Sequence, residues 1–213
     1  MHGFDGSTAA IVLAAGHGRR MGIAKALLDV DGMTLAEHHV TRLVEMGCAP
    51  IVIVLRPEIA CAIGPRLECF SGLRLVAART SSQAESLVAG VRALGSSVAA
   101  ISASRILISP VDMMPPSVAV ARTLHAALVP PLLAVTPTYG GRGGHPVLIR
   151  PEVFAPMLQA AERSPNGQIP SLRDVLEELG PRRARVEVAD ATVLGDFDAP
   201  ADLPAMTSTS RGS

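Results

Sequence analysis

Short, unbroken runs of apolar residues alternate along this chain with longer segments of helical periodicity, and this alternation constrains the fold more than any other feature. A strand with one face in water alternates polar and apolar side chains, whereas an unbroken run predicts a strand covered on both faces. The predicted strands are Thr8–Leu13, Ile51–Leu55, Leu73–Ala77, Arg105–Ser109, Leu132–Thr136, Pro146–Ile149 and Arg185–Val188. The sequence therefore predicts an α/β fold with a mostly parallel sheet between helices.

Between these runs, apolar residues recur at helical spacing. Gly47 and Gly95 follow two of the predicted helices, as expected of glycine at a helix C-terminus. No long linker or internal repeat interrupts the pattern, so we predict one domain over residues 1–206 and a disordered tail over 207–213. The predicted helices are Leu35–Met46, Ser82–Leu94, Ser117–Leu128, Glu152–Glu162 and Ser171–Leu179, with a final turn or short helix over Asp198–Leu203.

The composition excludes several classes of protein. An apolar content of 48% excludes global disorder, and 19 basic against 19 acidic residues argue against a binder of nucleic acid or membrane surfaces. No apolar run is long enough to span a membrane, and the first residues lack the features of a secretion signal. Cys48, Cys61 and Cys69 lack metal-ligand spacing, so we expect a cytoplasmic protein with reduced cysteines in packing roles.

The first strand runs into a glycine-rich loop that also carries cationic side chains. In open parallel sheets ligands bind beyond the carboxyl ends of the strands, so this loop is a candidate site. Its glycines are Gly16, Gly18 and Gly22, and its cations are Arg20 and Lys25. Free backbone N–H groups and full positive charges suit a triphosphate. The alternative is a glycine-rich turn with solvated arginines.

Two common phosphate-binding motifs do not match this loop. It has no Gly-Lys pair, so it is not a Walker A loop, and its glycines are one residue too far apart for the dinucleotide fingerprint. Arg56 stands at the end of the second strand, where NAD-binding proteins carry an acidic residue. Because an arginine there suits the 2′-phosphate of NADPH, an NADPH-dependent reductase of a redox-active small molecule remains an alternative.

Three regions resemble the molybdenum cofactor nucleotidyltransferases. Residues 13–28 resemble the signature LAAGxGxRMGxxKxLL of that family. Thr136–Ile149 is similar to its GxxGHPV segment, and Ser171–Val175 followed by Leu194–Leu203 is similar to its closing region. The match covers nearly the whole chain in order. It implies a single Rossmann-like domain, a three-layer αβα fold with a mostly parallel mixed sheet of the nucleotide-diphospho-sugar transferase type.

The resemblance also implies an activity and its partners. The expected reaction is Mg²⁺-dependent transfer of CMP, less readily GMP, from the triphosphate to a phosphorylated acceptor, molybdopterin, with release of pyrophosphate. Ala15 favours CTP, because guanylyl members more often have glycine there. The expected partners are a nucleoside triphosphate, a small-molecule acceptor and, transiently, a molybdoenzyme or its chaperone, with no nucleic acid and no membrane.

The resemblance assigns roles to individual residues. Arg20 would hold the β- and γ-phosphates, and Lys25 would stabilise charge at the α-phosphate. Asp112 would bind Mg²⁺, completed by either Asp198 or Asp196. The expected nucleotide-binding residues are Leu13, Ala14, Ala15, Gly16, Gly18, Gly22 and Ser86.

Lys25 also stands out in the composition, because the other 18 basic residues are all arginine. A compact, strongly hydrated ammonium is not duplicated by a planar guanidinium. In a chain that uses arginine so heavily, a single lysine inside the glycine-rich loop is interpreted as a catalytic residue. Chance survival of one lysine is the alternative.

Two segments depart from the family pattern. Asp112–Pro115 has one residue more than the family's Asp-x-Pro, and Ser82–Leu87 stands where the family has Gly-Met-Ser-Ser-Ser-Leu. Glu85 places a negative charge in that second segment. These departures keep open a third reading, a non-catalytic protein that binds a nucleotide or cofactor.

Four histidines complete the set of candidates. His145, between glycine and proline, either contacts the acceptor or holds its loop, and the same choice applies to His17. His38 and His39 are neighbours on a predicted helix and point to different faces, so we do not expect them to form a metal pair.

Overall fold

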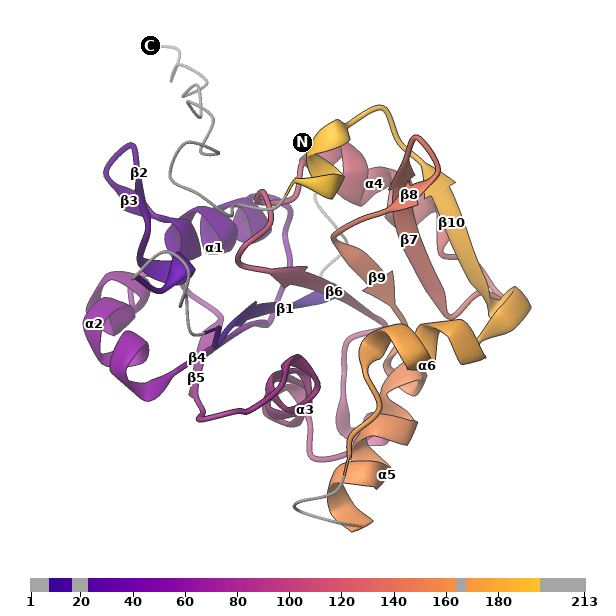
Figure 1. The fold of residues 1–213 in the computed structure, drawn as a ribbon, viewed down its shortest axis with the longest axis horizontal. Helices are drawn as coiled ribbons and strands as arrows, with labels where there is room; N and C mark the ends of the chain where they lie inside the picture. The colour runs from indigo at the N-terminus through magenta and orange to yellow at the C-terminus, as the bar shows by residue number, and fades with distance from the viewer. Residues whose placement is uncertain (1–7, 17–22, 164–167, 196–213) are drawn as a thin grey trace.

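A mixed sheet forms the middle layer of the protein (Figure 1). The computed structural model describes residues 8–16, 23–163 and 168–195. The main strands, in the spatial order β10-β7-β9-β6-β1-β4-β5, are Arg183–Glu187, Ala134–Tyr139, Val147–Ile149, Arg105–Pro110, Thr8–Ala14, Ile51–Leu55 and Leu73–Ala77, and β8 (Arg142–Gly143) pairs with β7. The short strands β8 and β9 run antiparallel to their neighbours, and the other pairings are parallel. The prediction of a mostly parallel mixed sheet is confirmed.

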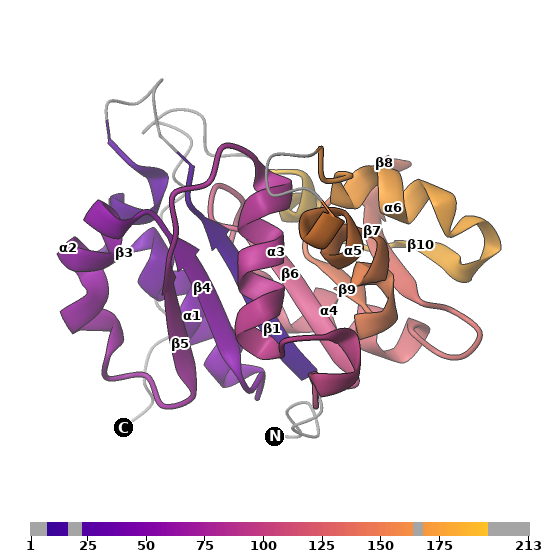
Figure 2. The same ribbon diagram turned by 90° about the horizontal axis from the view of Figure 1, so that it is seen from below.

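Helices cover both faces of this sheet, so the predicted three-layer architecture is confirmed as well (Figures 1 and 2). One apolar cluster joins one face to three helices, α1 (Leu35–Glu45), α2 (Pro57–Leu67) and α4 (Val118–Ala127). A second cluster joins the opposite face to α3 (Gln83–Leu94), α5 (Ala155–Arg163) and α6 (Leu172–Glu178).

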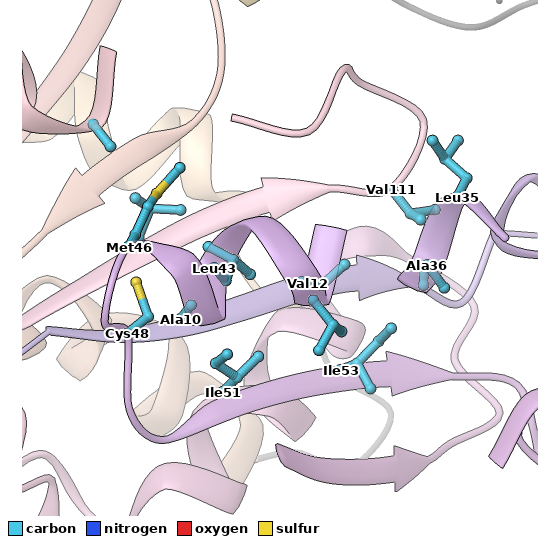
Figure 3. Packing of buried hydrophobic residues seen from close by; sticks show 14 of the residues in the cluster. Ala10, Val12, Leu35, Ala36, Leu43, Met46, Cys48, Ile51, Ile53 and Val111 are labelled. Atoms are coloured by element: carbon cyan, nitrogen blue, oxygen red, sulfur yellow. The ribbon is translucent and has the colours of Figure 1, made fainter. Parts of the chain in front are cut away.

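Strand β1 shows why its run of apolar residues is unbroken. Ala10 and Val12 point into the cluster under α1, whereas Ala9 and Ile11 point into the cluster under α3. Figure 3 shows the first of these clusters, with Ala10 and Val12 beside side chains of α1 and β4. Because successive side chains of a strand face opposite ways, a strand between two cores must be apolar at every position.

Helix α3 packs closely on β1, and Gly90 makes this possible. A Cβ atom at Gly90 would lie 2.8 Å from Cγ2 of Ile11, which is closer than a side chain tolerates. The cluster on this face joins α3 to β1 through Leu87, Val91 and Ile11. This packing brings the first turn of α3 beside the carboxyl end of β1.

Several elements differ from the sequence prediction. Helix α2 was not expected, because Gly64 and Pro65 in its interior are typical of loops, while Pro57 occupies its first turn, where proline is well tolerated. The hairpin of β2 (Asp29–Val30) and β3 (Met33–Thr34) was also missed. Strand β7 begins two residues later than predicted and extends to Tyr139. The predicted helix over Glu152–Glu162 is a 3-10 turn, η3 (Pro151–Phe154), followed by α5.

Two predictions at the C-terminal end, the turn or helix over Asp198–Leu203 and the disordered tail over 207–213, lie outside the described residues. Within the described part of the chain, no helix combines the length and the apolar character needed to cross a bilayer. All three cysteines are free; Cys48 is buried, whereas Cys61 and Cys69 are exposed.

Candidate functional site

A cleft of about 270 Å³ opens at the carboxyl ends of β1 and β6. The end of β1 forms one wall, the segment before α3 with its first turn forms a second, and the loop after β6 forms a third. The lining residues are Leu13, Ala14, Ala15, Gly16, Lys25, Ala26, Thr80, Ser81, Ser82, Gln83, Ser86, Pro110, Val111 and Asp112. We call this space the cleft.

Lys25 and Asp112 meet in the cleft. Lys25 begins the short 3-10 helix η1 (Lys25–Leu27), and its Nζ lies 3.7 Å from Oδ2 of Asp112. The Lys25 side chain is 18% exposed and that of Asp112 is 46% exposed, so the carboxylate keeps oxygen surface open to a further ligand. The N–H of Val111 donates to the carbonyl of Leu13 at 2.9 Å, which ties the loop carrying Asp112 to the end of β1.

Hydroxyl groups organise the wall of the cleft at the start of α3. The Ser82 side chain caps α3 by accepting from the N–H of Glu85 at 3.1 Å. Ser86 donates to the carbonyl of Ser82 at 3.1 Å, which leaves its oxygen to accept from the Thr80 hydroxyl at 2.6 Å. Glu85 accepts from the N–H and the hydroxyl of Ser81 at 2.8 and 2.6 Å, and these bonds hold the pKa of its carboxyl low. The charge of Glu85 thus orders the segment before α3, and Glu85 is not among the residues that line the cleft.

Two histidines of helix α1 bond segments that flank the cleft. His38 is within 2.8 Å of the carbonyl of Val30 through Nε2, and His39 is within 3.0 Å of the carbonyl of Met113 through the same atom. Nδ1 of His39 lies 3.3 Å from the Ser109 hydroxyl. Burial lowers the pKa of His39 to about 4, and the backbone bond to Met113 offsets this only in part. The two histidines bond different segments, in agreement with the expectation that they point to different faces.

A second cavity of about 440 Å³ lies over the sheet between α3 and α6, and we call it the trough. Its floor is apolar, and three arginines, one from α6 and two from β10, reach it. The lining residues are Leu13, Gln83, Ala84, Leu87, Ile108, Thr136, Gly143, Gly144, His145, Val147, Ser171, Leu172, Arg173, Leu176, Arg183 and Arg185. Because Leu13 and Gln83 line both cavities, the trough and the cleft adjoin.

The arginines of the trough repel one another. The pKa of Arg183 is lowered by burial and also by the charges of Arg185 and Arg173, and Glu177 opposes this. Glu177 is itself paired with Arg173, Nε to Oε1 at 3.2 Å. Arg183 donates through Nη2 to the hydroxyl of Thr136 at 3.3 Å, but its buried Nε has no hydrogen-bond partner among the described residues. The trough therefore presents positive charge and an unused donor, a combination that suits an anion.

The loop between β8 and β9 closes one side of the trough. The N–H of Gly144 donates to Pro137 and that of His145 donates to Val193, both at 2.9 Å. Only glycine fits at position 144, because a Cβ atom there would lie 2.1 Å from the carbonyl oxygen of Val193. His145 lines the trough and a third cavity, of about 350 Å³, that Gln83 and Asp112 also line. Gln83 therefore lines all three cavities.

The fit of a divalent cation depends on Asp112. Among the described residues, no three His, Cys, Asp or Glu side chains are grouped as a metal site. Mg²⁺ commonly takes only one or two protein carboxylates and completes its shell with water and substrate phosphates. A half-exposed Asp112 beside a phosphate-sized cleft fits that chemistry.

Most of the site residues that were proposed from the sequence and lie within the described ranges are close together in the structure. The residues that line the cleft are Leu13, Ala14, Ala15, Gly16, Lys25, Ser86 and Asp112, and His145 lines the adjoining trough. Arg56, on which the reductase reading depended, donates to Glu58 at 2.7 Å and is not among the residues that line the cleft. The proposed residues outside the described ranges are His17, Gly18, Arg20, Gly22, Asp196 and Asp198.

Sequence reasoning missed the residues that shape the trough and support the cleft. Arg183 and Arg185 are two positions apart on β10, so strand periodicity places them on one face and was a usable signal. Gln83 carries no such signal, because its place follows from the packing of α3 on β1. The role of His39 depends on a contact with a residue 74 positions away.

Known proteins resemble this chain in sequence and in structure. Residues 10–184 match the model of the MobA-like NTP transferase domain. A segment of 50 residues is 52% identical to a probable molybdenum cofactor guanylyltransferase from Opitutus terrae, and it spans 24% of this chain and 25% of that protein.

Two solved structures illustrate the likeness of the fold. A 4-diphosphocytidyl-2C-methyl-D-erythritol synthase from Anaerococcus prevotii superposes with a TM-score of 0.72, at 16% identity and 92% coverage of each chain. A Mycobacterium tuberculosis protein solved in complex with manganese has a TM-score of 0.68 at 18% identity, covering 92% of this chain and 95% of that one. At these identities the likeness concerns the fold.

Proposed function

The chain belongs to the MobA-like NTP transferase domain family, and from this premise we propose that it transfers a nucleotide from a nucleoside triphosphate to a phosphorylated small molecule. The observation that carries the proposal is the meeting of Lys25 and Asp112 at 3.7 Å in a cleft bounded by the end of β1. An acceptor phosphate oxygen attacks the α-phosphorus in line and forms the new P–O bond. The bond between the α-phosphorus and the bridging oxygen breaks, and pyrophosphate leaves.

Positioning and charge neutralisation supply the rate in such a reaction, because little covalent chemistry falls to the protein. Lys25 stabilises the charge that develops at the α-phosphate. Gly16 and its neighbours hold the phosphates by backbone N–H groups, with Arg20 on the β- and γ-phosphates. Asp112 holds the divalent cation, with Asp196 or Asp198 as a second carboxylate, and the cation when bound neutralises phosphate charge. Mg²⁺ is the proposed ion; the manganese complex of the structural neighbour supports a divalent metal.

The proposed donor is CTP. The methyl group of Ala15 lines the cleft and takes space that a glycine would leave open, which favours the smaller pyrimidine. The name of the Opitutus terrae relative, a probable guanylyltransferase, instead favours GTP, although the matched segment covers a quarter of that protein. Both nucleotides therefore belong in the test.

The trough supports an anionic acceptor. It adjoins the cleft at Leu13 and Gln83, it presents arginines to its interior, and its floor is apolar. A phosphorylated molecule with a flat apolar body suits such a space, and molybdopterin is the proposed acceptor.

Pyrophosphate release, measured with CTP or GTP, Mg²⁺ or Mn²⁺, and molybdopterin, tests this function. We expect turnover that requires metal, is faster with CTP, and is lost in Asp112→Asn. A thermal shift assay gives an independent readout, since a ligand at 100 times its Kd stabilises the fold by about 2.7 kcal/mol. Stabilisation by CTP without pyrophosphate release would contradict the transferase and support a binding protein. Stabilisation by NADPH without metal would support the reductase.

A further inference from the structure

Helix α1 contacts both segments that carry the two charged residues of the cleft. The carbonyl of Leu28, just after η1, accepts from the N–H of Leu35 at 2.8 Å, and His38 bonds the carbonyl of Val30. On the other side, His39 bonds the loop after β6. The segment after Lys25 and the segment around Asp112 are thus both fixed to one helix.

The contacts of His39 surround Asp112 in the chain. Ser109 lies before Asp112, and Met113 follows it directly; both bond the His39 ring. Val111 takes part as well, because its backbone interacts with the ring and its side chain lies in the same apolar cluster as Leu35 and Ala36 of α1 (Figure 3). We call residues Val111–Pro115 the Asp112 loop.

Hydrogen-bond chemistry decides the form of the ring. A carbonyl oxygen only accepts, so Nε2 of His39 carries the proton that it donates to Met113. Burial disfavours a second proton, and Nδ1 therefore accepts from the hydroxyl of Ser109. His39 is fully buried. Packing alone does not require a histidine at such an apolar core position, because leucine or valine would fill the space but could not form these bonds. A leucine would also leave the carbonyl of Met113 without its donor, which destabilises a buried polar group.

We propose that His39 is a positioning residue for the transfer reaction: it holds the Asp112 loop against α1 and so sets the place of the Asp112 carboxylate relative to Lys25. The proposal rests on the function proposed above. It assigns His39 no contact with substrate.

His39→Leu and His39→Gln separate this role from simple packing. Leucine removes both hydrogen bonds, whereas the glutamine amide keeps an N–H donor for Met113. For His39→Leu we expect kcat about tenfold lower with KM for the nucleotide unchanged, because a misplaced group costs rate rather than ground-state binding. His39→Gln should recover most of this loss. Ser109→Ala removes only the hydrogen bond between the Ser109 hydroxyl and Nδ1 of His39. This variant replaces His39→Leu in the test if His39→Leu does not fold.

Three measurements do not depend on turnover. Hydrogen exchange should be faster at the amides of Val111 and Met113 in His39→Leu, with no change in β10. Electron paramagnetic resonance of Mn²⁺ with CTP should show a different ligand environment of the ion in His39→Leu than in the wild type. Nitrogen NMR should find Nε2 of His39 protonated and Nδ1 unprotonated.

Leu43→Ala is the matched control, because Leu43 is also fully buried on α1 and has no hydrogen bond to the Asp112 loop. It should destabilise the protein without changing exchange in the loop. Equal exchange in the loop for His39→Leu and the wild type, or the same profile in Leu43→Ala, would overturn the proposal. Absence of pyrophosphate release by the wild type would overturn the proposed function instead, and the exchange and NMR results would still decide the role of His39.

Discussion

The cleft and the trough adjoin at Leu13 and Gln83, yet their charged side chains are arranged in different ways. In the cleft, Lys25 faces Asp112, and bonded hydroxyl groups form one wall. In the trough, the charges of Arg185 and Arg173 act against that of Arg183, and Glu177, which opposes them, is already paired with Arg173. In the cleft, opposite charges are therefore already paired without a ligand. In the trough, the excess positive charge would be neutralised by a bound anion.

Because of this difference, we expect the two cavities to respond to different kinds of mutation. In the cleft, removal of one charge leaves its partner exposed to the reacting groups, so the effect falls on the rate. In the trough, removal of one arginine reduces a repulsion, so the effect falls on acceptor binding and leaves the fold intact.

Lys25→Ala should have the largest effect. Loss of a cation at the developing charge lowers kcat by about 10² to 10³, with a small change in KM for the nucleotide. Steady-state pyrophosphate release measures both constants. Arg42→Ala, on the outer side of α1, is the control and should behave like the wild type. A loss below threefold for Lys25→Ala would remove the distinction between the cavities.

Acid should lower the free energy of unfolding through protonation of His39, which bonds the loop that carries Asp112. With a pKa of about 4 in the folded protein against an ordinary histidine value of 6.5, the unfolded chain binds a proton first as the pH falls. The contribution of His39 is complete above pH 6.5 and is lost towards pH 4, a decrease in the free energy of unfolding of about 3 kcal/mol.

Urea unfolding at pH 7, 5.5 and 4.5 measures this decrease. His39→Leu should show a shallower dependence on pH over the same interval, although it is less stable at pH 7. Parallel curves for the two proteins would show that other groups produce the acid sensitivity.

Arg183→Gln tests the trough. We expect KM for the acceptor to rise about 10- to 150-fold, since a charge-assisted bond to an anion contributes about 1.5–3 kcal/mol. kcat and KM for the nucleotide should stay within twofold. Tm should not fall, because the substitution relieves repulsion from Arg185 and Arg173. A lower Tm with an unchanged KM for the acceptor would indicate a structural role instead.

Ser86→Ala should have the smallest effect. It removes the acceptor for Thr80 and the donor to Ser82, a loss of about 1 kcal/mol in the free energy of unfolding. KM for the nucleotide should rise two- to threefold, while KM for the acceptor stays unchanged. Titration with each substrate measures the two KM values separately. An equal change in both would indicate that Ser86 acts where the cleft and the trough adjoin rather than in the cleft alone.

The fold was largely predictable because strands between two cores are apolar at every position, as in β1 and β4. Helix α2 was not predictable in this way, since Gly64 and Pro65 contradict the local signal and only packing on the sheet stabilises it. Strand β9 appears in the sequence as one more run, and its reversed direction follows from the tertiary pairing with β6 and β7.

The cleft was predictable to the extent that it is local in sequence. Ala15, Gly16 and Lys25 lie within one short segment, and Asp112 follows a recognisable strand. The hydrogen bond from His39 to Met113 joins residues 74 positions apart, and no periodicity encodes it. The trough lies between these cases, because the spacing of Arg183 and Arg185 indicates a shared face but not what that face covers.

The position of Gln83 has a consequence for inhibitors. Because Gln83 lines the cleft, the trough and the third cavity beside His145, a single molecule that reaches from the cleft into the trough would pass this residue. Joining a cytidine phosphate to an anionic apolar head turns the second binding event into an intramolecular one, so the combined affinity can exceed either part by about 10² or more. Affinity of such a bisubstrate compound for this chain would then depend on the trough as well as on the cleft.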